Sequence, residues 1–225
     1  MDLPMFPLGS VLLPGQLMPL HIFEARYQAM LEHCRTHGDE FGVVLIQRGH
    51  EVGGGDIRSD VATVARILDI TEAAPGHWAI ITAGVRRVRV TRWHQDEPWP
   101  HADVEPLTDD DEPLTDDDGG EPVKPVAVAV PGLWTGVLNR LTVIGDIAAA
   151  MGDESYTDLP DVSDDPRLGS FQVTALSPLG AFDRQKILAT TNLPERLRML
   201  TELLDDVIVT LRAARSFGGG SPFGA

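Results

Sequence analysis

The residues with the greatest chemical potential lie near the start of the chain, where His21, Glu24 and Arg26 are close neighbours. A histidine followed three positions later by a glutamate is half of a metal-binding pattern, but a protein site for zinc takes three or four ligands. The pair lies where an apolar run gives way to a predicted helix. We interpret Glu24 and Arg26 as residues that fix this strand-to-helix junction through hydrogen bonds or an ion pair, and we expect no chemistry there.

Other reactive side chains lack the partners that catalysis or metal binding needs. His33 and His37 are four residues apart, but no third ligand is indicated. The lysines, Lys124 and Lys186, follow no phosphate-binding glycine loop, and no serine is placed to form a dyad with Lys186. Cys34 lies on the apolar stripe of a predicted helix, which favours a core thiol over a nucleophile. We predict no catalytic residue, no metal site and no cofactor.

Two short apolar runs and a helix position these residues. The runs are Met5–Leu8 and Leu17–Phe23, with a turn at Pro14–Gly15 between them. Prolines in and beside both runs remove backbone donors, so we expect these strands at a barrel rim or sheet edge. The period then changes from 2 to 3.6, and a helix is predicted from about residue 24 to 35. Its apolar stripe is Tyr27, Met30, Leu31 and Cys34.

The amino-acid composition limits the classes of function that this protein can have. The chain has 225 residues and a formal net charge of −16, which opposes general binding to nucleic acid or to anionic lipid. One segment could still offer a local basic face for nucleic acid: a strand that carries Arg86, Arg87, Arg89 and Arg92. Apolar runs are too short to span a membrane, no secretory signal is seen, and the single cysteine fits a reducing compartment. We expect a cytoplasmic protein.

The remaining pattern changes from strands to helices at an acidic segment. Strands are predicted at 41–46, 61–71, 78–82, 85–93 and 101–107, with a turn at Pro75–Gly76, and helices at 131–152, 166–176, 180–190 and from 193 onward. Asp165 and Asn192 are the expected caps of the second and the last of these helices. The expected apolar stripes of these two helices are Leu168, Phe171, Ala175 and Leu176, and Leu197, Leu200, Leu204, Val207, Ile208 and Leu211. Between the strands and the helices, residues 109–122 favour a solvated loop over a calcium site, because their spacing does not match the twelve-residue calcium loop. The expected domains are a β-barrel subdomain (1–108), an acidic flexible linker (109–124), a helical subdomain (125–214) and a disordered Gly-rich tail (215–225).

Several of these segments together resemble the amino-terminal, substrate-binding domain family of Lon proteases. The resemblance rests on Phe6–Leu8, Leu13–Gly15, Pro19–Tyr27, Phe41–Leu45, Gly84–Val90, Pro98–Val104, Arg184–Leu188 and Glu195–Leu197. It implies an α+β fold: a PUA-like β pseudo-barrel with one inserted helix, followed by a C-terminal helical subdomain. In this family pattern Pro19, Phe23, Glu24, Arg26 and Tyr27 form a structural motif. The ATPase and peptidase modules of a full Lon protease have no counterpart in this sequence, so a stand-alone, non-enzymatic member is expected.

The resemblance also implies a binding role. We expect a non-catalytic protein that recognises polypeptides or acts as an adaptor in protein quality control. Trp93, Trp99 and Trp134 are the candidate polypeptide-binding residues, because aromatic side chains dominate binding energy in interface pockets. Core packing is the competing interpretation for each of them. An RNA-binding module of PUA-like fold and a self-associating regulatory scaffold remain the alternatives, although nucleic acid is disfavoured by the net charge.

Overall fold

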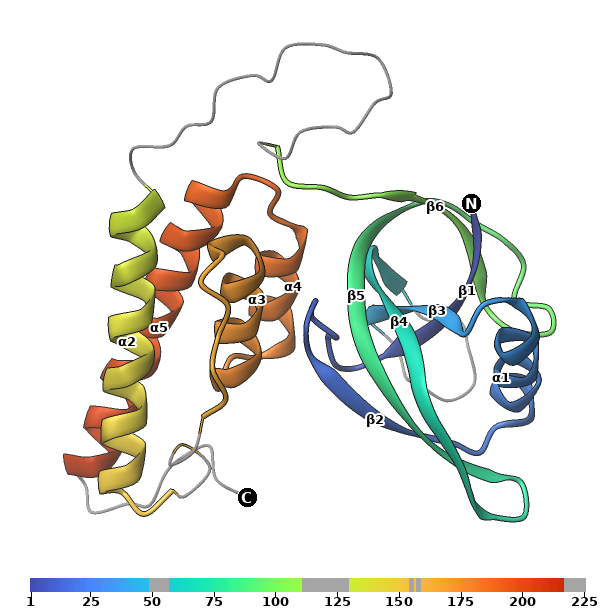
Figure 1. The fold of residues 1–225 in the computed structure, drawn as a ribbon, viewed down its shortest axis with the longest axis horizontal. Helices are drawn as coiled ribbons and strands as arrows, with labels where there is room; N and C mark the ends of the chain where they lie inside the picture. The colour runs from blue at the N-terminus through green and yellow to red at the C-terminus, as the bar shows by residue number, and fades with distance from the viewer. Residues whose placement is uncertain (49–56, 111–129, 154–155, 157–158, 217–225) are drawn as a thin grey trace. The chain divides into compact units, whose positions relative to one another are not determined.

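The computed structural model describes residues 1–48, 57–110, 130–153, 156 and 159–216. The chain divides into two compact units, Met1–Leu107 and Thr108–Ala225. Figure 1 shows that the first unit is built mainly from strands and the second from helices. Most of the predicted acidic linker (109–124) and of the predicted tail (215–225) lies outside the described residues; Asp109, Asp110, Arg215 and Ser216 are the parts within them.

The β unit is a six-stranded mixed sheet that closes on itself. Its strands follow the order β2-β5-β4-β3-β1-β6, and a further pairing of β5 with β6 completes a ring of five strands to which β2 is added. One helix, α1, is inserted between β2 and β3 (Figure 1). The α+β prediction is therefore confirmed. The elements are β1 (Asp2–Leu8), β2 (Leu17–Ile22), α1 (Ala25–His37), β3 (Glu40–Arg48), β4 (Ile57–Ala74), β5 (His77–Trp93) and β6 (His101–Pro106).

Of the two proline-containing strands, which were expected at a barrel rim or sheet edge, β2 is an edge strand, whereas β1 lies between β3 and β6 in the sheet order. Strand β1 pairs antiparallel with β6 through Asp2–Pro4 and parallel with β3 through Met5–Leu8. It thus changes partner halfway along its length. Because each half is paired on one side, the prolines of β1 remove donors without interrupting a ladder on the other side.

Strands β4 and β5 form one long hairpin, and the two runs predicted at 78–82 and 85–93 are a single strand. The turn between them has Gly76 at φ 74°, as a Pro-Gly turn of type II requires. Ala65 pairs with Gly84 but Val64 pairs with Arg86, so Val85 is the extra residue of a bulge. A side chain at Gly84 would run into the backbone carbonyl of Leu13, which explains why glycine stands there.

Both faces of β3 are buried because the β unit has two apolar clusters. Val43 belongs to one cluster and Val44 to the other, as expected for neighbouring strand residues that point to opposite faces. The first cluster includes the predicted stripe of α1, and all four of its residues are buried. This apolar stripe is what attaches α1 to the sheet.

The helical unit contains α2 (Val130–Ala150), α3 (Pro166–Leu176), α4 (Ala181–Ala189) and α5 (Leu193–Ser216). Two predicted caps are present: Asp165 accepts a hydrogen bond from the Arg167 N–H, and Asn192 accepts one from the Glu195 N–H at 3.0 Å. The predicted stripe of α5 is buried. That of α3 is wrong in part, because Leu168 is 38% exposed while Ser170, Val173 and Thr174 are buried.

A buried ion pair ties the first residues of this unit to α5. Arg196 is fully buried and donates to both carboxylate oxygens of Asp109 at 2.6 Å. It also donates to Ser170 Oγ and to the Thr190 carbonyl, and it lies 4.4 Å from the centroid of the Phe171 ring. The sequence places Asp109 in a solvated linker, and for this residue the prediction is wrong.

Within the described ranges, no helix combines the length and the apolar character that crossing a bilayer requires.

Candidate functional site

A cleft of about 210 Å³ opens in the β unit around the segment with which the sequence analysis began. Its walls come from β1, from β2 and from the junction that leads into α1. Most of the lining side chains are apolar, with His21 and Glu24 as the polar contributions. The lining residues are Phe6, Pro7, Leu8, Pro19, Leu20, His21, Phe23, Glu24 and Tyr27.

The cleft lies where two strands of the unit face each other without pairing. Strands β1 and β2 both contribute to its lining, yet they are not neighbours in the sheet order. The Met5 N–H donates to the Pro100 carbonyl, on the side of β1 away from β3. Backbone groups two residues on point the same way. Pro7, which has no N–H, therefore occupies a position on this open side of β1.

The junction between β2 and α1 carries the ion pair expected from the sequence. Glu24 Oε2 accepts a hydrogen bond from Arg26 Nε at 3.0 Å, and both side chains are mostly shielded from solvent. The Arg26 guanidinium also lies 4.5 Å from the centroid of the Tyr27 ring. Phe23, in contrast, is 54% exposed at the cleft and stacks on His77. Phe23 is thus an apolar lining residue that is open to a partner.

The three candidate tryptophans occupy different environments. Trp134, on α2, is 8% exposed and lies against Gly169 of α3. Trp93 is half-buried beside the second apolar cluster, with the Arg58 guanidinium 4.7 Å from its ring centroid. Trp99 is half-buried against the first cluster and near His33. None of the three lines the cleft.

The predicted basic strand is largely neutralised by neighbouring carboxylates. Arg86 donates to Glu40 at 2.7 Å, Arg66 donates to the same carboxylate, and Arg89 pairs with Asp60. Hydrogen bonds from Arg86 and then Arg66 lower the pKa of Glu40, so this carboxylate stays charged. Arg87 is buried. The strand therefore does not present the run of exposed cations that the sequence suggests.

The single cysteine is a core thiol. Cys34 is 2% exposed, and its Sγ lies 3.5 Å from the Glu40 carbonyl. Burial, reinforced by the nearby Asp39 carboxylate, raises the pKa of this thiol to about 12. A thiol with so high a pKa is a poor nucleophile because only the thiolate attacks.

We expect Cys34 to react with a thiol reagent such as dithionitrobenzoate only when the protein unfolds. The folded pKa exceeds the unfolded value of 9.0, so the folded state holds this proton more tightly. Its contribution to stability is complete below pH 9 and declines as the pH rises toward about 12. Urea titrations at several pH values in this range would measure the decline in the free energy of unfolding. The Cys34→Ala variant should lack the part of that decline that the thiol causes. Rapid labelling of the native protein at neutral pH would contradict the assignment.

Five of the lining residues stand out in the sequence, but none of them as the wall of a cleft: Pro19, Phe23, Glu24 and Tyr27 belong to the structural motif of the family, and His21 is half of a metal-binding pattern. Phe6, Pro7 and Leu8 are expected as part of a strand and of the family resemblance. The signal that points to the cleft is the pair of prolines, Pro7 and Pro19, in two strands that then cannot pair closely with each other. Their alignment across a gap is a tertiary property and is not encoded in either run alone.

Comparisons with known proteins show which protein family has this architecture. Residues 2–206 match the model of the ATP-dependent protease La (LON) substrate-binding domain. Among curated proteins, Lon protease 2 of Herpetosiphon aurantiacus is 25% identical over 214 residues, covering 94% of this chain and 24% of its own length. Lon protease 2 of Myxococcus xanthus is also 25% identical, over 90% of this chain and 23% of its own length.

Solved structures give the same result. A Lon N-terminal domain protein from Xanthomonas campestris has a TM-score of 0.60 at 26% identity, covering 89% of this chain and 96% of its own. The N-terminal domain of the Mycobacterium avium complex Lon protease has a TM-score of 0.59 at 16% identity, covering 92% and 99%, and this likeness concerns the fold alone. This chain spans about a quarter of the length of the curated relatives that it matches. The chain belongs to the LON substrate-binding domain family.

Proposed function

We propose that this protein is a non-catalytic cytoplasmic binding module that holds extended apolar segments of polypeptides, as an adaptor or substrate receptor in protein quality control. The observation that supports this most is the apolar cleft between β1 and β2, with Phe23 exposed at it. The proposal extends to this chain the role that the family's description states, substrate binding, and assigns a surface to it.

The size and lining of the cleft favour a polypeptide side chain over a cofactor. Pockets for drug-sized ligands and cofactors usually measure about 300–1,000 Å³, whereas this cleft measures about 210 Å³. That space suits one or two apolar side chains of a longer ligand. Phe23 lies beside it as an aromatic anchor of the kind that dominates interface energetics.

The prolines of the two walls favour recognition of side chains over backbone pairing. Peptides that add a strand to a sheet edge depend on main-chain hydrogen bonds. Pro7 and Pro19 each remove one donor from the strands that face the cleft. A site that holds its ligand mainly by apolar contacts has little selectivity for the exact sequence of the ligand. Such low selectivity suits a receptor for unfolded segments.

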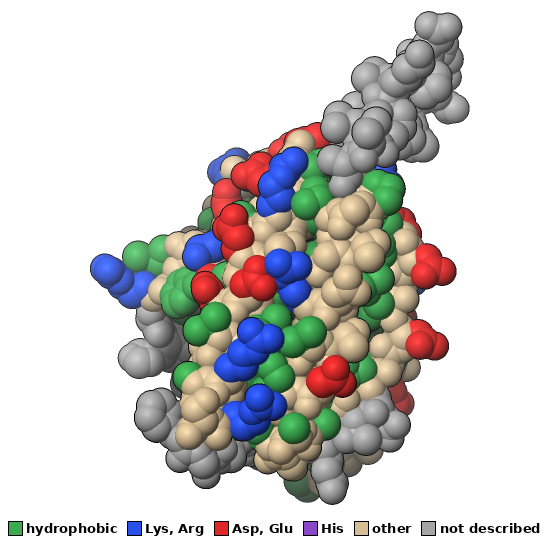
Figure 2. Space-filling view, turned by 90° about the vertical axis from the view of Figure 1, so that its left-hand side faces the viewer, with side chains coloured by type: hydrophobic (Ala, Val, Ile, Leu, Met, Phe, Trp, Pro, Cys, Tyr) green, Lys and Arg blue, Asp and Glu red, His purple; other side chains and the backbone are tan. Residues whose placement is uncertain are grey.

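Charge opposes the RNA-binding alternative. Of the β5 arginines, Arg86 and Arg89 are paired, Arg87 is buried and Arg92 is exposed, and the net charge of the chain is −16. Figure 2 shows that Lys and Arg side chains are interspersed with Asp and Glu on the face that contains α2 and α5. Arg140 of α2 pairs with Asp205 of α5 at 2.9 Å. Among the residues that the structure describes, this face carries no basic stripe of the kind that follows a phosphate backbone.

The test is peptide binding measured by fluorescence anisotropy with Phe23→Ala and Phe182→Ala. The probe is a labelled extended peptide of alternating apolar and small polar residues. We expect Phe23→Ala to weaken binding about tenfold, because removing an exposed aromatic anchor costs contact area at the centre of the interface. Phe182 is 60% exposed on α4 and outside the cleft lining, so Phe182→Ala is the matched control and should bind like the wild type.

Two modified probes separate the mode of binding. A peptide with methylated backbone nitrogens should bind nearly as well as the parent, whereas one with its apolar residues replaced by serine should not bind. If the wild type fails to bind the parent peptide, or if both phenylalanine variants bind equally well, the cleft is not the receptor surface. Strong loss on backbone methylation would instead assign a strand-addition mode.

A further inference from the structure

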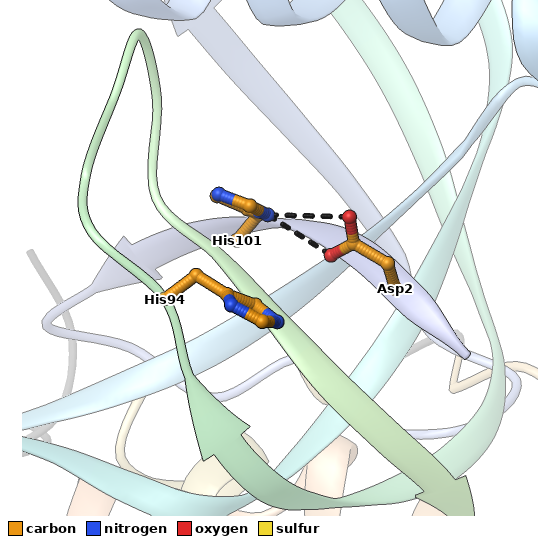
Figure 3. A group of neighbouring side chains, drawn as sticks. All are labelled: Asp2, His94 and His101. Atoms are coloured by element: carbon orange, nitrogen blue, oxygen red, sulfur yellow. Dashed lines mark hydrogen bonds and ion pairs between the residues drawn. The ribbon is translucent and has the colours of Figure 1, made fainter.

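A cluster of two histidines and an aspartate lies at the end of the β unit where β1 begins. Figure 3 shows Asp2, His94 and His101 with their side chains directed toward one another. One potential ligand atom from each of the three lies within 4.8 Å of the others. His101 Nδ1 is 3.0 Å from Asp2 Oδ1, and the rings of His94 and His101 stack with centroids 4.7 Å apart.

The sheet itself brings these residues together. His94 directly follows β5 and His101 begins β6, and the His94 N–H donates to the His101 carbonyl across the hairpin. Asp2 is in β1, which pairs with β6 so that Asp2 is opposite Asp103. All three positions are therefore fixed by backbone hydrogen bonds of neighbouring strands, which limits how far the ligand atoms must move to close on an ion.

We propose that Asp2, His94 and His101 form a binding site for a divalent transition-metal ion, with Zn²⁺ as its natural occupant. Two imidazole nitrogens and one carboxylate oxygen are a donor set that zinc accepts, with a fourth position left for water. The histidine rings are half-buried, with 26% and 27% of each side chain exposed, so they are held but remain open to an ion. An all-oxygen preference makes Ca²⁺ and Mg²⁺ poor competitors.

A second carboxylate supports the histidines from outside the trio. His94 Nε2 is 3.0 Å from Asp103 Oδ2. Metal-binding histidines usually hold their other ring nitrogen against such a carboxylate, which fixes the tautomer and orients the ring. Asp103 is suited to this positioning role when His94 binds through Nδ1. The bound ion would join the start of β1 to the β5–β6 hairpin.

The experiment is Zn²⁺ titration by calorimetry on chelator-treated protein that comprises residues 1–225 and carries no histidine tag. We expect one ion per chain, abolished in His94→Gln and in His101→Gln. The double variant His33→Gln, His37→Gln removes the stacked histidine pair of α1 and is the matched control, which should bind zinc like the wild type. Asp103→Asn should bind about tenfold more weakly, as changes in supporting carboxylates do.

A spectroscopic readout checks the position of the ion. Trp93 adjoins His94, so Cu²⁺ bound at the trio should quench tryptophan fluorescence in the wild type and much less in His101→Gln. Absence of saturable zinc binding, or loss of binding in the His33, His37 variant instead, would overturn the proposal. Peptide binding at the cleft uses other residues, so failure of either proposal leaves the other standing.

Discussion

Asp109→Ala should destabilise the helical unit by about 3–5 kcal/mol, because removing one partner leaves the other buried as an uncompensated charge. The remaining group is Arg196, which is fully buried and held by Asp109 through two hydrogen bonds of 2.6 Å. Its bonds to Ser170 Oγ and to the Thr190 carbonyl satisfy other donors but bring no negative charge. Urea unfolding followed by the helical circular dichroism signal would measure the loss.

A matched arginine–aspartate pair on the surface is the control. Arg140 also forms two hydrogen bonds to one carboxylate, that of Asp205, at 2.9 Å each, but both side chains are substantially exposed. Exposed pairs contribute about 0.2–1 kcal/mol, so Asp205→Ala should have a small effect. Equal losses in the two variants would show that burial is not what makes the Asp109–Arg196 pair important.

The double variant Asp109→Leu, Arg196→Met refines this prediction. Replacing a buried ion pair by apolar residues is often neutral or stabilising, in contrast to breaking it. We therefore expect the double variant to be clearly more stable than Asp109→Ala alone. If it is the least stable of all, the hydrogen bonds from Arg196 to Ser170 and Thr190 carry more of the stability than the ion pair does.

Trp134→Ala should also cost about 3–5 kcal/mol of stability, the usual loss for truncating a buried aromatic core residue. The Trp134 ring is 8% exposed and fills the space above Gly169, where even a Cβ would collide with it. The small residue on α3 and the large one on α2 are thus complementary. Thermal unfolding gives the size of the loss.

The same variant separates a core role from the binding role that the sequence suggests for Trp134. Measured at a temperature where the variant is still folded, its affinity for the extended peptide should equal that of the wild type. Trp134→Phe should recover part of the stability and leave affinity unchanged. A variant of normal stability and reduced peptide affinity would instead make Trp134 a binding residue.

Local pattern predicted most of the elements because their determinants are local. The stripe of α1, the caps of α3 and α5 and the turns at Gly15 and Gly76 depend on residues close in sequence. Motif resemblance predicted the fold and family, since the match covers several separate segments. The local patterns and the family resemblance agree with each other, as expected for a sequence that specifies one structure.

What the sequence did not predict depends on partners far along the chain. Asp109 resembles its acidic neighbours, and only its contact with Arg196, 87 positions away, explains its burial. Likewise, the arginines of β5 suggest a basic face when the sequence is considered alone. In the folded protein, Glu40 and Asp60 lie beside them and form ion pairs with two of them. The spacing of His94 and His101 along the chain matches no metal-binding pattern, although a hairpin formed by residues 85–93 and 101–107 sets them opposite each other.

The change of partner along β1 also sets an order of assembly. Strand β1 precedes the other strands of the β unit, but its pairing is completed only when β6 is available, and the amino group of Met1 donates a hydrogen bond to the Val104 carbonyl 103 positions later. Contacts of such long range form slowly, and unpaired strands invite aggregation in the meantime. During synthesis, Met5–Leu8 can pair once β3 has left the ribosome, whereas Asp2–Pro4 must wait, exposed to chaperones, until β6 has also left the exit tunnel.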